Sequence, residues 1–194
     1  MAQTKKVEVK AAILAAAFEL FRDNGYADTS IPAIAKAAGT STANVYVYFN
    51  SKLDILFTLY GPWLQVRLDR LDRSLHRIRS PQKRLEKLLL GLWHDLPYED
   101  NGFSSNLVQA LASTSKNDYD PSLRKQFQDR VARWLTDMLP NLQQNADTLA
   151  GILLMAFDGF AINARLSHGM NFNPSMARVT SDLLAAPEPP TTNR

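Results

Sequence analysis

The stretch from Ser30 to Lys52 is SIPAIAKAAGTSTANVYVYFNSK, and it decides the fold of the N-terminal part of the chain. Ser30 and Ser41 each precede a short segment with helical periodicity. Serine is favoured before a helix because its hydroxyl accepts a hydrogen bond from a free backbone N–H. Gly39 lies between the two segments and predicts a tight turn, and small alanines before it allow close packing. The stretch therefore predicts a helix-turn-helix motif.

The second helix of such a motif buries one face and presents the other to the major groove of DNA. Val45 and Phe49 are four residues apart and predict the buried face. Asn44 can pair with adenine through two hydrogen bonds, and Ala43 or Val47 can contact a thymine methyl group. Hydroxyl groups near the helix starts can contact phosphate oxygens. The candidate DNA-binding residues are Ser30, Ser41, Thr42, Ala43, Asn44, Tyr46, Val47, Tyr48 and Lys52.

Some of these side chains also have a purely structural interpretation. Tyr46 and Tyr48 could pack on a neighbouring helix, although their flanking positions favour phosphate contacts. Lys52 would be an ordinary solvated lysine elsewhere. At the start of a helix, where free N–H groups and the dipole already attract anions, it favours a phosphate contact. The lysines within residues 1–10 are expected to be solvated, with a DNA contact as the alternative.

Helical periodicity dominates the rest of the chain, with no convincing β-alternation and no internal repeat. A helix from Val9 to Gly25 precedes the motif, and loops are expected at 97–105 and 117–121. Further helices are expected over 51–79, with a kink at Gly61-Pro62, and over 81–96, 106–113, 121–139, 146–167 and 174–185. The prediction is an all-α fold of about nine helices.

The chain has 194 residues, 45% hydrophobic and 21% charged, which is enough for a sizeable core. It has no cysteine, which excludes disulfides and cysteine-ligated metal sites. Its three histidines are scattered and catalytic motifs are absent, so we expect no enzyme, no cofactor and no metal. No apolar run of 18 residues and no signal peptide occur, so we expect a cytoplasmic protein without membrane contact. The net charge of +3 is only a weak hint of an anionic partner.

The motif resembles the DNA-binding region of tetracycline-repressor (TetR) type regulators, over roughly Val9 to Leu59. The resemblance is carried by Gly25-Tyr26, Thr29-Ser30-Ile31, Ile34-Ala35, Ala38-Gly39, Ser41, Val45-Tyr46, Tyr48-Phe49 and Lys52. It implies a homodimeric DNA-binding transcriptional regulator, a repressor that binds a near-palindromic operator and that a small-molecule effector releases. It also implies a three-helix head at 1–50, with the recognition motif at 30–49. A helical ligand-binding and dimerisation domain at 51–186 and a disordered tail at 187–194 would follow.

The chain departs from the family pattern inside the recognition helix. Val47 stands where arginine or another polar residue is common, Thr42 where lysine is common, and Ala43 where glycine is common. Base readout is therefore expected to rest on Asn44, Thr42 and methyl contacts, and the operator of a relative does not transfer. An all-helical protein-interaction adaptor without DNA binding is the alternative function.

Large or polar residues on otherwise apolar helices are candidates for an effector pocket, although plain core packing is the alternative. They are Trp63, Trp93, Phe103, Trp134, Phe157 and Asn163. Asp158 lies inside an apolar run. It has three interpretations: the partner of an arginine, a polar group in the pocket, or an interface residue. Candidates for a dimer interface, with packing inside the chain as the alternative, are Ala156, Gly159, Leu183 and Leu184.

Overall fold

The computed structural model describes residues 2–98, 102–115, 121–166 and 173–185, and these ranges are helical without a strand, which confirms the all-α prediction. The α-helices are α1 (Ala2–Asp28), α2 (Ile31–Ala37), α3 (Thr42–Tyr48), α4 (Lys52–His76), α5 (Pro81–Leu90), α6 (Leu96–Tyr98), α7 (Phe103–Ser113), α8 (Ser122–Met138), α9 (Ala146–Leu166) and α10 (Ser175–Ala185). A π-helical turn, η1 (Gly91–Asp95), joins α5 to α6 without a break, and a 3-10 turn, η2 (Pro140–Asn145), precedes α9. The predicted tail at 187–194 and most of the loop at 117–121 lie outside the described residues.

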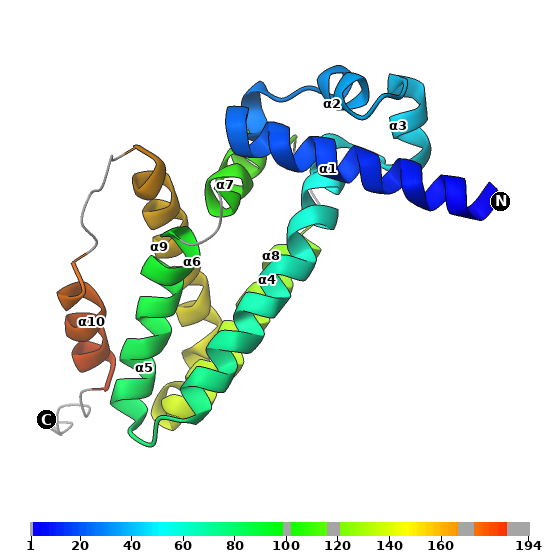
Figure 1. Cartoon of the computed structure of the whole chain (residues 1–194). Coiled ribbons are helices and arrows are strands. Elements are labelled where there is room, and N and C mark those ends of the chain that lie inside the picture. The colour runs from blue at the N-terminus through cyan, green and yellow to red at the C-terminus, as the bar shows by residue number, and fades with distance from the viewer. Residues whose placement is uncertain (1, 99–101, 116–120, 167–172, 186–194) are drawn as a thin grey trace, which may run out of the picture.

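Helices α1 to α3 form the head of the molecule, and α4 to α10 form its body (Figure 1). Three serines begin the helices that follow α1, and two of them, Ser30 and Ser41, do so as expected. The hydroxyls of Ser30, Ser41 and Ser51 accept hydrogen bonds from backbone N–H groups in the first turns of α2, α3 and α4. Gly25 interrupts α1 with a φ of 82° and a ψ of 167°, which only glycine adopts readily.

The helix-turn-helix geometry follows from the small buried core of the head. Ile34 and Ala35 of α2 and Val45 of α3 are buried, and Phe49 closes the core after α3. Figure 1 shows α2 and α3 on one side of α1, with α4 leaving the head as a long helix into the body. The head therefore presents α3 at one end of the molecule.

Helix α4 continues through Pro62, as expected for the single helix predicted over 51–79, since one missing N–H does not stop a helix that buries apolar residues on both sides of it. One predicted boundary is wrong, for a local reason. Helix α7 begins at Phe103, three residues earlier than expected. The left-handed φ of 83° at Gly102 redirects the chain there, and the buried Phe103 ring fixes the first turn.

Aromatic side chains join the head to the body where α1, α4 and α7 meet. Tyr60 of α4 packs against Phe103 of α7 with ring centroids 4.3 Å apart, and Trp63 lies 4.9 Å from the same Phe103 ring. Phe18 of α1 contacts Tyr60 from the head side, at 6.5 Å. The cores of the head and the body are therefore continuous.

Helix α9 packs against α7, α8 and η1, and α10 packs against α5. The stretch Pro140–Ala164 has a mean hydropathy of 1.3 and is long enough to cross a membrane, by length and composition. Within it, Ala150, Leu154, Phe157 and Ala161 are buried against neighbouring helices. These buried residues are packed as in a core helix, whereas Ile152, Met155 and Ile162 of the same stretch are exposed.

Candidate nucleic-acid interface

The outer face of α3 is apolar and aromatic rather than charged. Tyr46 and Val47 are 55% and 66% exposed, and Ala43, one turn earlier, is exposed as well. Val45 is buried on the opposite face, as the sequence predicts. A helix with one face anchored in the core and small or methyl-bearing side chains on the other can enter a major groove closely.

Asn44 is held in place by two contacts with the turn before α3. Its backbone N–H donates to Ser41 Oγ at 3.1 Å, and its Nδ2 donates to Thr40 Oγ1 at 2.7 Å. The Asn44 carbonyl oxygen and second amide N–H are the groups that a paired contact with adenine requires. The sequence analysis missed Thr40, although the spacing of four residues between Thr40 and Asn44 was its signal.

The remaining DNA-binding candidates differ in exposure. Ser30 and Ser41 are exposed at helix starts, where their hydroxyls already cap α2 and α3. Thr42 is partly buried, and Tyr48 packs partly against the core. Of the two tyrosines, Tyr46 therefore has the freer phenol, and the phosphate contacts stay predictions.

Lys52 has a structural role that the sequence analysis did not foresee. Its Nζ donates to the carbonyl oxygens of Tyr26 and Thr29, both at 2.7 Å, and lies 4.1 Å from the centre of the Tyr26 ring. Burial lowers the pKa of the Lys52 ammonium, and the nearby Asp28 carboxylate partly offsets this. The expectation of a lysine free for phosphate is revised, because two of its three N–H groups tie α4 to the end of α1.

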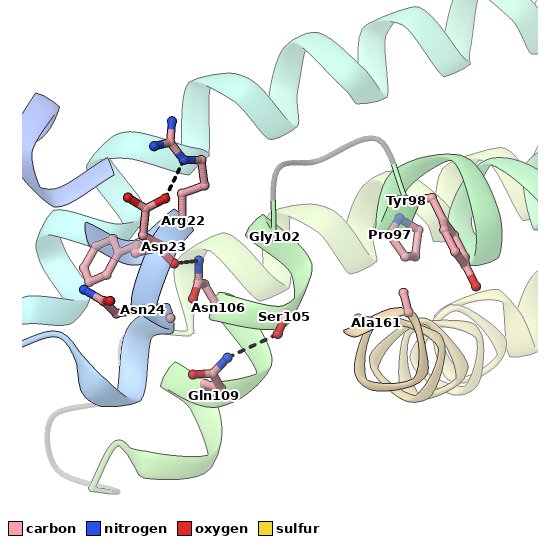
Figure 2. A pocket seen from close by; sticks show the side chains of 13 residues that line it. Arg22, Asp23, Asn24, Pro97, Tyr98, Gly102, Ser105, Asn106, Gln109 and Ala161 are labelled. Carbon is pink, nitrogen blue, oxygen red and sulfur yellow. Dashed lines mark hydrogen bonds and ion pairs between the residues drawn. The ribbon is translucent and has the colours of Figure 1, made fainter. Parts of the chain in front are cut away.

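A polar cleft of about 410 Å³ lies at the junction of the head and the body (Figure 2). The end of α1 forms one wall, with Arg22, Asp23 and Asn24, and α7 forms another, with Asn106 and Gln109. Pro97 and Tyr98 of α6 and Ala161 of α9 lie across from them. The cleft brings together side chains from the head and from three helices of the body.

The six predicted pocket residues do not gather in one place. Trp63 and Phe103 pack together at the head–body junction. Trp93 donates its indole N–H to the Leu153 carbonyl at 3.2 Å, and the Trp134 indole donates to Asp72 at 2.6 Å. These contacts make Trp93 and Trp134 parts of the packed body, because each indole N–H already has a partner, although Trp134 also lines a surface cleft with Arg130 and Arg133. Phe157 is buried against Phe127, and Asn163 is partly buried near the end of α9.

A second cleft, of about 290 Å³, lies between α4 and α5. Arg67, Arg70 and Lys87 line it together with Leu71 and Leu96. Asp95 of η1 also lines the cleft and pairs with Lys87 at 2.9 Å, so the lining combines a surplus of positive charge with apolar side chains.

Asp158 is the partner of an arginine, which was one of its three interpretations. Both of its carboxylate oxygens accept from Arg124 of α8 at 2.7 Å, and the two side chains are about three-quarters buried. A two-point contact of this kind fixes α9 against α8.

The outward faces of α9 and α10 are apolar. On α9, Ile152, Met155 and Ile162 are 52%, 64% and 42% exposed, and Gly159 lies between the last two. The exposed apolar residues of α10 are Met176, Val179 and Leu183. We call these six residues the exposed apolar faces.

The predicted dimer residues coincide only in part with the exposed apolar faces. Leu183 belongs to these faces and Gly159 lies between Met155 and Ile162, whereas Ala156 and Leu184 pack partly against the core of the same chain. Met155 was not among the predicted dimer residues, although the 3, 4, 3 spacing of Ile152, Met155, Gly159 and Ile162 was an available signal.

Residues 13–59, which run from α1 to the first turns of α4, match the family described as bacterial regulatory proteins, tetR family. Over 73 residues the chain is 30% identical to the fatty acid metabolism regulator protein of Bacillus subtilis (strain 168). Over a stretch of the same length it is 37% identical to the HTH-type transcriptional regulator HbdR of Aromatoleum sp. (strain CIB). Each match covers 38% of this chain, and the matches span only 38% and 32% of the two relatives, respectively.

The fold as a whole is similar to solved structures. The fatty acid degradation regulator FadR from Bacillus halodurans matches with a TM-score of 0.63 and 18% identity, over 90% of this chain and 93% of that one. FadR from Bacillus subtilis in complex with stearoyl-CoA matches with a TM-score of 0.58 and 18% identity, over 90% and 96% of the two chains. At this identity the likeness concerns the fold alone.

The helix-turn-helix motif of α2 and α3 lies within the stretch that matches the tetR family. This match over residues 13–59 confirms the resemblance seen in the sequence of the head.

Proposed function

We propose that this protein is a DNA-binding transcriptional regulator that acts in the cytoplasm as a homodimer on a near-palindromic operator. The observation that carries the proposal is the outer face of α3, where Ala43, Tyr46 and Val47 are exposed beside an Asn44 amide held by Thr40. The DNA-binding domain is residues 1–50, and the effector-binding and dimerisation domain is residues 51–186.

The exposed apolar faces support the homodimer. Soluble monomers rarely leave several large apolar side chains exposed along one helix face. On α9, Ile152, Met155, Gly159 and Ile162 follow a 3, 4, 3 spacing, which suits the packing of one helix against another across a two-fold axis. Gly159 adds a position where an added Cβ would meet nothing within 4 Å, so a partner helix can approach closely there.

We propose repression relieved by a small molecule as the mode of regulation. The Bacillus subtilis FadR structure holds stearoyl-CoA, an anionic ligand with a long apolar chain. In the second cleft, Arg67 and Arg70 lie beside Leu71 and Leu96, while Lys87 is paired with Asp95; the two arginines and the apolar side chains provide the matching combination of charge and apolar surface. Stearoyl-CoA is therefore the first probe, and DNA that stays bound at saturating stearoyl-CoA would remove long-chain acyl-CoA as the effector class.

The test of DNA binding is selection from a random duplex pool by the full-length protein, followed by affinity measurements on the selected sequence. We expect a near-palindromic sequence, bound more tightly than random DNA. Its affinity should fall by roughly a thousandfold between about 50 and 200 mM salt, because each phosphate contact releases counterions. Recovery of no preferred sequence, together with capture of a protein partner, would support the adaptor alternative instead.

Replacing Asn44 should change sequence preference and not only affinity. Asn44→Ala removes the amide that pairs with a base and should cost about 1–3 kcal/mol on the selected duplex while relaxing one base position. Tyr46→Phe is the control, because loss of a phosphate contact should weaken all sequences nearly equally. Binding of Asn44→Ala to duplexes altered at each position measures this, and a uniform loss over all positions would contradict the reading role.

A further inference from the structure

The end of α1 is held by a side chain from the body. The backbone conformation of Gly25 turns the peptide group of Tyr26 out of the helical direction. The N–H of Tyr26 donates to Asn106 Oδ1 at 2.7 Å, and Asn106 Nδ2 donates to the carbonyl of Phe21 at 3.0 Å. The Asn106 side-chain amide thus contacts the backbone on both sides of Gly25. Asn106 is 2% exposed, and the loss of buried hydrogen bonds is strongly destabilising.

A second amide on α7 continues this contact. Gln109 lies one turn after Asn106, and its Oε1 accepts from the N–H of Ala27 at 3.1 Å. The other end of the Gln109 side chain donates to Ser105 Oγ at 3.1 Å, which orients it. Figure 2 shows Asn106 and Gln109 reaching from α7 toward the end of α1.

Helix α4 holds the same short segment from another side. Lys52 donates to the carbonyls of Tyr26 and Thr29, while α7 takes the N–H groups of Tyr26 and Ala27. The N–H groups of Tyr26 and Ala27 thus donate to α7, while the carbonyls of Tyr26 and Thr29 accept from α4. Any shift of α7 relative to α4 therefore pulls directly on the backbone that leads into α2 and α3.

We propose that Asn106 is the positioning residue that sets the orientation of the head, and so of α3, relative to the body. The inference rests on the proposed function, because orientation matters only if two heads bind one DNA molecule. Two recognition helices must lie about 34 Å apart to enter successive major grooves. A head that is folded but loosely oriented spends only a fraction of its time at that spacing, and its apparent affinity falls by that fraction.

The test compares Asn106→Leu with the wild-type protein on two duplexes, one with both half-sites of the selected sequence and one with a single half-site. Asn106→Leu keeps the size of the side chain and removes both hydrogen bonds. We expect affinity for the two-half-site duplex to fall about tenfold, while affinity for the half-site duplex stays within about twofold. Gln109→Ala should show the same pattern more weakly, because it removes one bond at the edge of the junction.

Ser113→Ala is the matched control on the same helix, since the Ser113 hydroxyl donates to carbonyls within α7. It should bind both duplexes as the wild-type protein does. Circular dichroism checks that each variant keeps its helix content, and Gln109→Ala carries the test if Asn106→Leu does not fold. Equal losses on both duplexes would reduce Asn106 to a stabilising residue, and unchanged binding to both would overturn its role. Wild-type protein that prefers no DNA sequence would instead refute the proposed function.

Discussion

Changing Met155 and Leu183 together to glutamate is expected to yield a monomer. The two side chains are 64% and 72% exposed on α9 and α10, so the charges cost little in a free chain. In a dimer built on the exposed apolar faces, they would be buried without partners. Light scattering should therefore give half the wild-type mass, and affinity for the two-half-site duplex should fall about a hundredfold as the linkage of two heads is lost.

Val66→Glu is the matched control for this double variant. Val66 is an apolar side chain of α4 that is 57% exposed, so it receives the same chemical change outside the exposed apolar faces. It should keep the wild-type mass and DNA affinity. A Met155→Glu, Leu183→Glu protein that stays dimeric would place the interface on another surface.

The second large effect is expected at the break in α1. Gly25→Asn forces a side chain into a φ of 82° and a ψ of 167°, a region that residues other than glycine rarely adopt. The cost should be about 1–3 kcal/mol in the free energy of unfolding, measured by urea denaturation. We also expect weaker binding to the two-half-site duplex, because relief of the strain moves the Tyr26 N–H away from Asn106.

The same substitution at Gly39 separates backbone strain from a general effect of a polar side chain in the head. Gly39 also has a positive φ, of 66°, but an added Cβ there meets nothing within 4 Å, and asparagine is the residue other than glycine that adopts positive φ most readily. Gly39→Asn should therefore cost less in the free energy of unfolding than Gly25→Asn does. Equal destabilisation by the two variants would argue against special strain at Gly25.

The features that could be predicted from sequence depend on neighbours within one helical turn. Ser30, Ser41 and Ser51 begin helices because their hydroxyls reach N–H groups three residues ahead. The buried face of α3, with Val45, follows from the helical period in the same way. These are local rules, so a single sequence contains all the information that they need.

The features that could not be predicted depend on distant partners. Lys52 is correctly placed at a helix start, but its partners, the carbonyls of Tyr26 and Thr29, come from another part of the chain. The buried position of Asn106 could not be predicted from its neighbours in the sequence, because an asparagine in a helix can equally well face solvent. The tryptophans were expected near a pocket, but their N–H partners, Leu153 for Trp93 and Asp72 for Trp134, are fixed only by how the helices pack.

The two hydrogen bonds of Asn106 span 80 and 85 positions of the chain. Contacts over such a distance close late, because a long loop must be ordered before they form. During synthesis from the N-terminus, α1, α2 and α3 are complete well before α7 has been made. The end of α1 therefore lacks its contacts with α7 until that helix has been made, and the head reaches its final orientation only after much of the body has been synthesised.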